Sequence, residues 1–321
     1  MRWGILGAAN FAKDWMAPAI HAAKGAELVA LATSDPVKAE GFQAFAPGLQ
    51  VFDDYDALLA DAGIDAVYIP LPNHLHVTWT IKALEAGKHV LCEKPIALNA
   101  TEIDSIIAAR DKAGKLAAEA FMIVHHPQFD RARSLVQGGA IGTLRHVDAA
   151  FTYNNASAVG NIRNRAETGG GGLPDIGVYA FGAARFVTGA DCQRVTFADV
   201  QFENDVDVFA HVAADFGAFT YGALVSMRMQ NRQHITFHGD TGHLTLTAPF
   251  NANVYDVAEL TLETGGGGRQ VERWPAANHY ILQVEAFCRA AQGEADYACP
   301  LEFSRGTQDM IDQVFAKARN S

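Results

Sequence analysis

Short apolar runs alternate with amphipathic helical segments over the first 121 residues. The apolar runs, typical of buried parallel strands, lie at residues 3–6, 27–33, 51–52, 66–70, 89–92 and 116–121. The helical segments between them cover residues 14–23, 36–45, 55–60, 76–86 and 101–113. Strands that alternate with helices predict a parallel, doubly wound α/β sheet.

The pattern changes after residue 121. The later elements are a helix (127–137), a long strand (142–153), short alternating strands (194–273) with a hairpin turn at 265–268, and two closing helices (278–292 and 303–319). Residues 122–321 are therefore predicted to form an α+β domain with a large, mostly antiparallel, open sheet. Because one face of this sheet is packed and the other is available, we expect a homodimer or homotetramer that pairs through it.

Composition narrows the range of partners and locations. The 321 residues carry a net charge of −11 without a basic run, which argues against nucleic acid and anionic membranes as partners. No segment is apolar for long enough to span a bilayer. The chain enters a strand directly after Met1, so we expect no signal peptide. Four scattered cysteines fit a reducing cytoplasm and argue against a zinc knuckle.

A small-residue loop follows the first strand. Its sequence is Gly7-Ala8-Ala9-Asn10-Phe11-Ala12, in which Ala9 and Ala12 replace the second and third glycines of the Gly-x-Gly-x-x-Gly dinucleotide fingerprint. Alanine is the smallest substitute, so the loop can still approach a pyrophosphate. The alternative is an ordinary strand-to-helix turn. Residues 1–121 are thus predicted to be a Rossmann domain whose Gly7–Phe11 loop binds a dinucleotide.

The end of the second strand favours NADP(H) over NAD(H). An acidic residue there normally binds the adenosine ribose hydroxyls. Asp35 is the only acidic candidate, and the following Pro36 makes it a good helix cap instead. Thr33 and Ser34 are small donors, and Lys38 brings a positive charge that suits a 2′-phosphate.

Two further loops follow strands at the same sheet edge, where open α/β sheets bind ligands. Pro72, Asn73 and His76 come after the strand at 66–70, and we predict that they lie beside the cofactor. A metal site is not expected, since the histidines at 74 and 76 do not share a helix face. Glu93 and Lys94 come after the strand at 89–92, and a lysine fixed there suggests chemistry.

Together these motifs resemble those of the glucose-fructose oxidoreductase / inositol dehydrogenase (Gfo/Idh/MocA) family. The matching segments are Trp3-Gly4-Ile5-Leu6-Gly7, Pro72-Asn73-His74-Leu75-His76, Ala86-Gly87-Lys88-His89-Val90-Leu91-Cys92-Glu93-Lys94-Pro95 and Gly169-Gly170-Gly171-Gly172-Leu173-Pro174-Asp175-Ile176-Gly177-Val178-Tyr179. The closest motif match is to the D-xylose dehydrogenase and dimeric dihydrodiol dehydrogenase branch, because Tyr179 stands where many relatives have histidine.

The resemblance implies roles for particular residues. It implies that Glu93 and Lys94 line the nicotinamide site and that Asp175 and Tyr179 complete the catalytic group. The segment Asn161-Ile162-Arg163 also resembles the corresponding segment of the xylose dehydrogenase branch.

Sequence alone leaves alternatives for the second-domain residues. The loop at 154–172 is either a solvated connection or a segment whose Asn161 and Arg163 bind sugar hydroxyls, and the glycines that end it are expected to lead flexibly into a helix. Asp175 and Tyr179, at i and i+4, share one helix face. Without the resemblance, they would read as a helix cap and a core tyrosine.

The predicted chemistry needs a proton acceptor, for which we nominate Tyr179. Lowering a tyrosine pKa from about 10 to about 7 requires roughly 4 kcal/mol. An ammonium about 4 Å away supplies on the order of 4 kcal/mol at an effective dielectric of about 20. We therefore expect Lys94 to lower the pKa of Tyr179, Asp175 to hold a substrate hydroxyl, and Glu93 to position the nicotinamide ribose.

The leading functional prediction is an NADP-dependent dehydrogenase or reductase acting on an aldose, a polyol or a cyclic diol. The alternatives are a non-catalytic NAD(P)-binding regulatory protein on the same fold, and an NADPH-dependent keto-sugar or anhydro-sugar reductase.

Overall fold

The computed structural model describes residues 1–319, and contacts divide the chain into two compact units. The first unit contains residues 1–122 and 279–305, and the second contains residues 123–278 and the chain from Gly306 onward. The sequence pattern placed a single boundary after residue 121. The return of residues 279–305 to the first unit has no local signal, because the helix there is amphipathic whichever unit it packs against.

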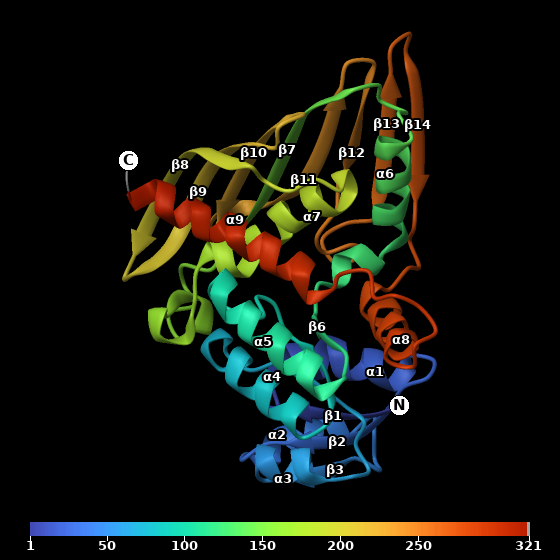
Figure 1. Cartoon of the computed structure of the whole chain (residues 1–321), viewed down its shortest axis with the longest axis vertical. Helices are drawn as coiled ribbons and strands as arrows, with labels where there is room; N and C mark the ends of the chain where they lie inside the picture. The colour runs from blue at the N-terminus through green and yellow to red at the C-terminus, as the bar shows by residue number, and fades with distance from the viewer. Residues whose placement is uncertain (320–321) are drawn as a thin grey trace. The chain divides into compact units, whose positions relative to one another are not determined.

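The first unit contains a six-stranded parallel sheet with strand order β3-β2-β1-β4-β5-β6. Figure 1 labels β1, β2, β3 and β6 of this sheet. Its strands are β1 (Arg2–Leu6), β2 (Glu27–Ala32), β3 (Gln50–Phe52), β4 (Ala66–Ile69), β5 (His89–Cys92) and β6 (Ala117–Glu119). Its helices are α1 (Ala17–Ala22), α2 (Pro36–Gln43), α3 (Tyr55–Ala60), α4 (His76–Glu85), α5 (Ala100–Ala113) and α8 (His279–Ala291). The doubly wound sheet predicted from the alternation is confirmed.

The order of the strands reverses between β1 and β4, which are neighbours in the sheet. Crevices at such a switch point, outside the carboxyl ends of the strands, are where doubly wound sheets bind their ligands. The loops after β1, β2, β4 and β5 all begin at this edge because the strands are parallel.

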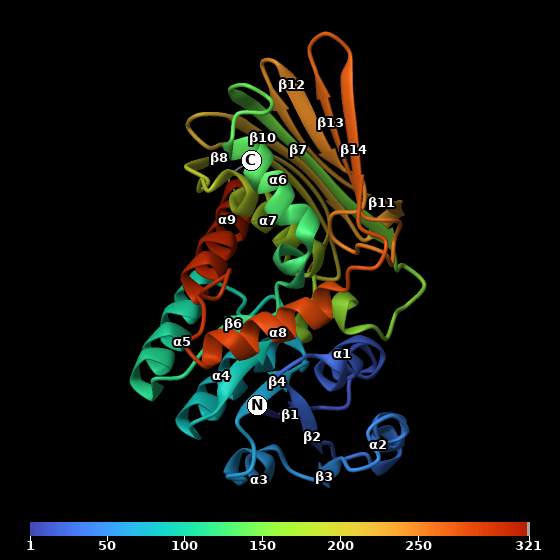
Figure 2. The ribbon, with the colours of Figure 1, turned by 90° about the vertical axis from the view of Figure 1, so that its right-hand side faces the viewer.

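The second unit is built on an eight-stranded sheet with strand order β14-β13-β12-β11-β7-β10-β9-β8 (Figure 2). The strands are β7 (Leu144–Asn154), β8 (Arg194–Glu203), β9 (Val206–Asp215), β10 (Thr220–Ser226), β11 (Arg228–Gly239), β12 (Gly242–Leu246), β13 (Glu259–Thr264) and β14 (Gly268–Arg273). All neighbours pair antiparallel except β7 and β10, which are parallel. The mostly antiparallel sheet is confirmed, and residues 265–267 form the predicted hairpin turn.

Helices α6 (Pro127–Gln137) and α7 (Val178–Thr188) pack on one face of this sheet (Figure 1). Alternation along β7 sends Val147, Ala149 and Phe151 into the core, whereas His146 and Asp148 point to the other face. Helix α9 (Leu301–Arg319) begins in the first unit and continues in the second, where Arg185 of α7 donates a 2.6 Å hydrogen bond to Thr307.

None of the helices among residues 1–319 is long and apolar enough to cross a membrane. All four cysteines are free thiols. The cytoplasmic location expected from the sequence stays a prediction.

Candidate active site

The loop after β1 has the backbone geometry of a tight strand-to-helix turn. Gly7 has a φ of +105°, and a Cβ there would meet the Leu71 side chain at 2.9 Å, so only glycine fits. Its amide donates to the Ala32 carbonyl at 2.9 Å, which ties the loop to the end of β2. Ala12 is fully buried in a π-helical turn (Ala12–Met16) that precedes α1. Alanine at the third glycine position is therefore accommodated, and residues 7–11 fit a pyrophosphate-binding loop.

The end of β2 is arranged as the capping argument predicted. Asp35 Oδ1 accepts the Val37 amide at 3.1 Å and caps α2. Thr33 is buried, and its hydroxyl accepts the Asp35 amide at 3.2 Å. Ser34 and Lys38 are exposed. The accessible donors at this strand end are thus the Ser34 hydroxyl and the Lys38 ammonium, whereas the Asp35 carboxylate caps α2.

His76 lies inside the loop framework of the first unit. Its side chain is fully buried, with Nδ1 2.8 Å from the Pro95 carbonyl and Nε2 2.7 Å from the Leu71 carbonyl. Burial lowers the pKa of His76, and the two carbonyls partly oppose that shift. The ring joins the loop after β4 to the loop after β5, so its contacts are structural. Pro72 and Asn73, which begin a 3₁₀ turn (Asn73–Leu75), are half-exposed at the same edge.

Glu93 and Lys94 follow β5 directly. Tyr68 of β4 donates to Glu93 Oε1 at 2.6 Å, and Glu93 Oε2 lies 3.3 Å from the Lys94 amide. Burial, reinforced by the Glu93 charge, raises the pKa of Tyr68, so this phenol remains a donor. Glu93 is therefore held by a neutral buried phenol in the neighbouring strand.

Tyr280 of α8 packs against aromatic residues that follow β1. Tyr280 packs edge-on against Phe11 of the β1 loop at 5.8 Å and tilted against Trp15 at 5.7 Å. Burial, followed by the Glu93 charge, raises the pKa of Tyr280. The sequence pattern gave no sign that a residue so late in the chain would pack beside Phe11.

In the second unit, Asp175 lies at the centre of a polar cluster. It belongs to a π-helical turn (η6, Leu173–Gly177) that continues into α7, and its side chain is only 11% exposed. Arg163 Nε lies 2.9 Å from Asp175 Oδ1, and Tyr153 Oη donates to Asp175 Oδ2 at 2.7 Å. One cation and one hydroxyl thus bind the two carboxylate oxygens. The predicted substrate ligands Arg163 and Asp175 are each other's partners.

Charge and burial in this cluster favour a fixed carboxylate. The carboxylate raises the pKa of Arg163, while burial and then the carboxylate raise the pKa of Tyr153. Tyr179 follows one turn after Asp175, and in its phenolate form it would add to the rise in the pKa of Arg163. The ring of Tyr179 is buried and packs against Phe151 and Phe250 at 6.0 and 6.2 Å. A phenol on an apolar wall, beside an ion pair, can act as an acid or base.

The loop before Asp175 is ordered by its own backbone. Gly171 and Gly170 donate to the Arg163 and Arg165 carbonyls at 3.1 and 3.0 Å, and a Cβ at Gly170 would come within 2.5 Å of the Arg163 carbonyl. The glycines that were expected to lead flexibly into the helix thus allow two backbone segments to pack closely. Asn161 caps a short 3₁₀ turn (Ile162–Asn164) through a 3.0 Å bond to the Arg163 amide.

Tyr153 is the residue that sequence reasoning missed. It is the second-to-last residue of the long β7 strand, where a half-buried aromatic residue is ordinary, and it lies 22 positions before Asp175 in the chain. The one available signal was its position directly before the polar loop that carries Arg163.

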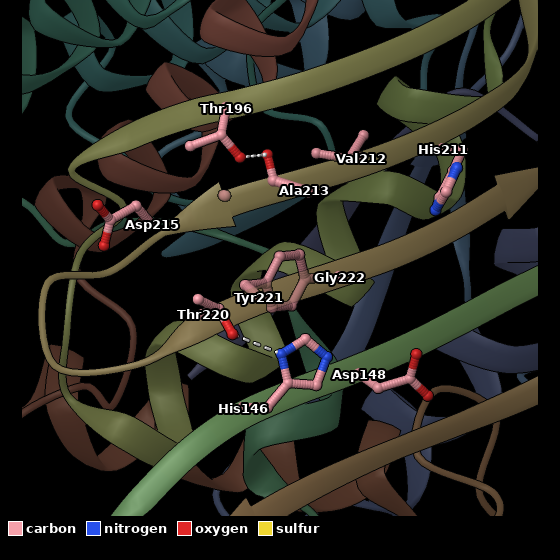
Figure 3. A pocket seen from close by; sticks show the side chains of 11 residues that line it. His146, Asp148, Thr196, His211, Val212, Ala213, Asp215, Thr220, Tyr221 and Gly222 are labelled. Atoms are coloured by element: carbon pink, nitrogen blue, oxygen red, sulfur yellow. Dashed lines mark hydrogen bonds between the residues drawn. The ribbon is translucent and has the colours of Figure 1, made fainter.

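Two further observations concern metal binding and a cavity away from these residues. Among residues 1–319, no group of three or more His, Cys, Asp or Glu side chains could hold a metal ion. A cavity of about 560 Å³ opens on the second sheet over β7–β10, lined by residues that include His146, Asp148, His211 and Thr220 (Figure 3). It contains none of the predicted site residues.

Comparison with known proteins identifies the class to which these features belong. Residues 1–121 match the model of an oxidoreductase family with an NAD-binding Rossmann fold, and residues 129–245 match the GFO/IDH/MocA C-terminal domain. Together with the full-length relatives below, these matches show that the chain belongs to the GFO/IDH/MocA oxidoreductase family, as the motifs predicted.

Three similar proteins are informative. A dTDP-3,4-didehydro-2,6-dideoxy-alpha-D-glucose 3-reductase from Saccharopolyspora spinosa is 43% identical over 316 residues, covering 98% of this chain and 94% of the relative. D-xylose 1-dehydrogenase (NADP(+)) 2 from Haloferax volcanii is 32% identical, covering 99% and 97%. A crystal structure of a 3-ketoreductase from Actinomadura kijaniata with NADP and TDP-benzene has a TM-score of 0.91 at 30% identity, covering 99% and 97%.

Proposed function

We propose that this chain catalyses NADP(H)-dependent oxidoreduction at a carbinol or carbonyl carbon of a sugar. The observation that carries the proposal is the Tyr153–Asp175–Arg163 cluster, which fixes a carboxylate one helical turn before Tyr179. The xylose dehydrogenase and 3-ketoreductase relatives support a sugar substrate. The 43% identity to a 3-reductase favours reduction of a keto-sugar as strongly as oxidation of an aldose.

Each proposed site residue has a distinct chemical task. Bound NADP(H) would supply or accept the hydride. In reduction, Tyr179 gives its proton to the carbonyl oxygen as the carbon–oxygen π bond breaks, and in oxidation the phenolate takes the hydroxyl proton back. Lys94 favours the phenolate, and Asp175 accepts a hydrogen bond from a neighbouring substrate hydroxyl. Arg163 and Tyr153 hold Asp175, and Asn161 orders the loop that carries Arg163.

The cofactor assignment rests on the first unit. The Gly7–Phe11 loop fits the pyrophosphate, and Pro72, Asn73, Glu93 and Lys94 surround the switch-point edge. We propose that His76 holds the loops after β4 and β5 together and does not itself contact the cofactor. Because Asp35 caps α2, Ser34 and Lys38 are the residues that can bind a 2′-phosphate there. The NADP-dependent relatives support the same choice.

Removal of the Lys38 charge is expected to weaken NADP(H) binding selectively. Lys38→Met should raise the KM for NADP(H) about 3- to 10-fold, equivalent to about 0.7–1.4 kcal/mol, and leave the KM for NAD(H) unchanged. The matched control is Lys112→Met at an exposed position late in α5. Higher kcat/KM with NAD than with NADP in the unmodified enzyme would overturn the cofactor proposal.

Initial rates in both directions test the reaction class. D-Xylose, D-glucose, myo-inositol and a trans-dihydrodiol would be assayed with NADP, and keto-sugars, free and nucleotide-linked, with NADPH. Turnover in either set supports the proposal and identifies the substrate class. Tight NADPH binding, measured by fluorescence, with no turnover in any assay would favour the regulatory-protein alternative.

We also propose that the chain self-associates through the sheet face that α6 and α7 leave uncovered. Thr236 and Thr245, joined by a 3.0 Å hydrogen bond, lie near the middle of that face. Sedimentation should give a mass two or four times 34.5 kDa, and Thr236→Arg should lower it to the monomer value. Thr101→Arg, on an exposed turn of α5, should have no effect. A monomeric unmodified protein would refute the proposal.

A further inference from the structure

The turn that carries Asp175 begins without a capping side chain of its own. The residue before it, Gly172, has no side chain that could cap the turn, so the first buried amide of η6 needs an acceptor from elsewhere. Asp207 of β9, 34 residues later in the chain, supplies one. Its Oδ2 accepts the Leu173 amide at 2.6 Å.

Asp207 is enclosed by the glycines that precede η6. Its side chain is 3% exposed, and its carboxylate also accepts hydrogen bonds from the Gly172 amide and from its own amide. A Cβ at Gly171 would overlap Asp207 Oδ1, and a Cβ at Gly172 would lie 3.3 Å from Oδ2. The glycine run is thus shaped around this carboxylate as well as around the Arg163 backbone.

We propose that Asp207 is a positioning residue for the catalytic helix: its buried carboxylate anchors the first amides of η6 and thereby sets where Asp175 and Tyr179 stand. Tyr153 and Arg163 hold Asp175 by its side chain, and Asp207 holds the same turn by its backbone. A negative charge at a helix N-terminus is also favoured by the helix dipole. This inference rests on the proposed function of Asp175 and Tyr179.

The charge state of Asp207 gives the anchor a pH dependence. Burial raises the pKa of Asp207 to about 6, its three amide donors oppose that rise, and Asp175, the charged group facing it from η6, adds to it. Above pH 6 the carboxylate is ionised and accepts all these donors, and below pH 6 protonation weakens the anchor. We expect kcat to fall as the pH decreases through about 6, and we expect Asp207→Asn to lack this acid limb.

The experiment compares Asp207→Asn with Asp215→Asn. Asp215 ends the same strand and also accepts a backbone amide, from Gly217 at 2.8 Å, but it does not bind η6. Asp207→Asn should lower kcat about 10- to 100-fold, because small misplacements of catalytic groups have effects of this size. The KM and dissociation constant for NADPH should stay unchanged. Asp215→Asn should match the unmodified enzyme in both measurements.

Amide hydrogen exchange separates this inference from the proposed function. Exchange at Gly172 and Leu173 should accelerate at least 10-fold in Asp207→Asn and stay unchanged in Asp215→Asn. Unchanged exchange in Asp207→Asn, or unchanged kcat, would overturn the positioning role. If the unmodified enzyme turns over no substrate, the proposed function fails, while the exchange result still decides whether Asp207 anchors η6.

A second variant covers the case in which Asp207→Asn does not fold. Gly172 has an ordinary φ of −69°, so Gly172→Ala disturbs little besides the contact with Asp207. It should lower kcat and accelerate Leu173 exchange in the same direction. The matched control is Gly160→Ala, whose added methyl group meets nothing within 4 Å. Equal behaviour of the two alanine variants would overturn the inference.

Discussion

Replacement of Tyr179 by phenylalanine is expected to lower kcat by about 100- to 10,000-fold, the range that general acid–base groups contribute. The fold should survive, because the ring of Tyr179 packs against Phe151 and Phe250 and phenylalanine keeps both contacts. Steady-state rates with the best substrate, together with NADPH binding by fluorescence, would measure the effect. Binding should stay unchanged while turnover is lost.

The matched control for this substitution is Tyr221→Phe. Tyr221 is another buried tyrosine of the second unit, it packs against Phe181 of α7, and its hydroxyl has no hydrogen-bond partner in the part of the chain that the structure describes. Its removal should leave kcat unchanged. If Tyr179→Phe kept most of its turnover, Lys94 would become the candidate acid and base, and Tyr179 would be a packing residue.

Removal of the Lys94 charge is expected to move the pH profile of oxidation toward alkaline pH. In the proposed site, the Lys94 ammonium would favour the phenolate of Tyr179, so its loss would raise the pKa at which Tyr179 becomes a base. For an ammonium and a phenolate about 4 Å apart at an effective dielectric of about 20, such a shift is at most about 3 pKa units. In Lys94→Met, kcat for oxidation near pH 7 should therefore fall up to about 1000-fold and recover partly as the pH rises.

The profile should be measured from about pH 6 to 10 for the unmodified enzyme, Lys94→Met and Lys82→Met. Lys82 is a partly exposed lysine of α4 that pairs with Asp56 at 2.9 Å, so its loss controls for a general change in surface charge. A Lys94→Met enzyme whose activity falls equally at every pH would contradict the electrostatic role and leave Lys94 a role in binding alone.

Local patterns predicted the elements that depend on local physics. The alternation of apolar runs and helical segments was enough for the parallel sheet, and Asp35 before Pro36 was enough for the α2 cap. The spacing of Asp175 and Tyr179 predicted a helical segment that carries both, and the structure has one, made of η6 followed directly by α7. Each of these features depends on side chains within a few residues of one another.

What sequence reasoning missed depends on distant partners. The parallel pairing of β7 with β10 joins segments about 70 residues apart, and the contacts of Asp175 with Tyr153 and of Leu173 with Asp207 cross 22 and 34 residues. No periodicity specifies such a partner. The hydrogen bond of His76 to the Pro95 carbonyl, 19 residues later, is another contact that no local pattern specifies.

The return of residues 279–305 to the first unit has a consequence for how the protein is made. Trp3, fully buried in β1, packs its ring 5.1 Å from Phe287 of α8, and Phe11 packs against Tyr280. During synthesis, the unit that leaves the ribosome first must wait for most of the chain before Tyr280 can pack against Phe11 in the loop after β1. Residues 279–305, which are translated late, thus complete the first unit. A nascent chain stalled before α8 would therefore expose the side chains of α1 that pack against α8, and it would be a natural substrate for chaperones.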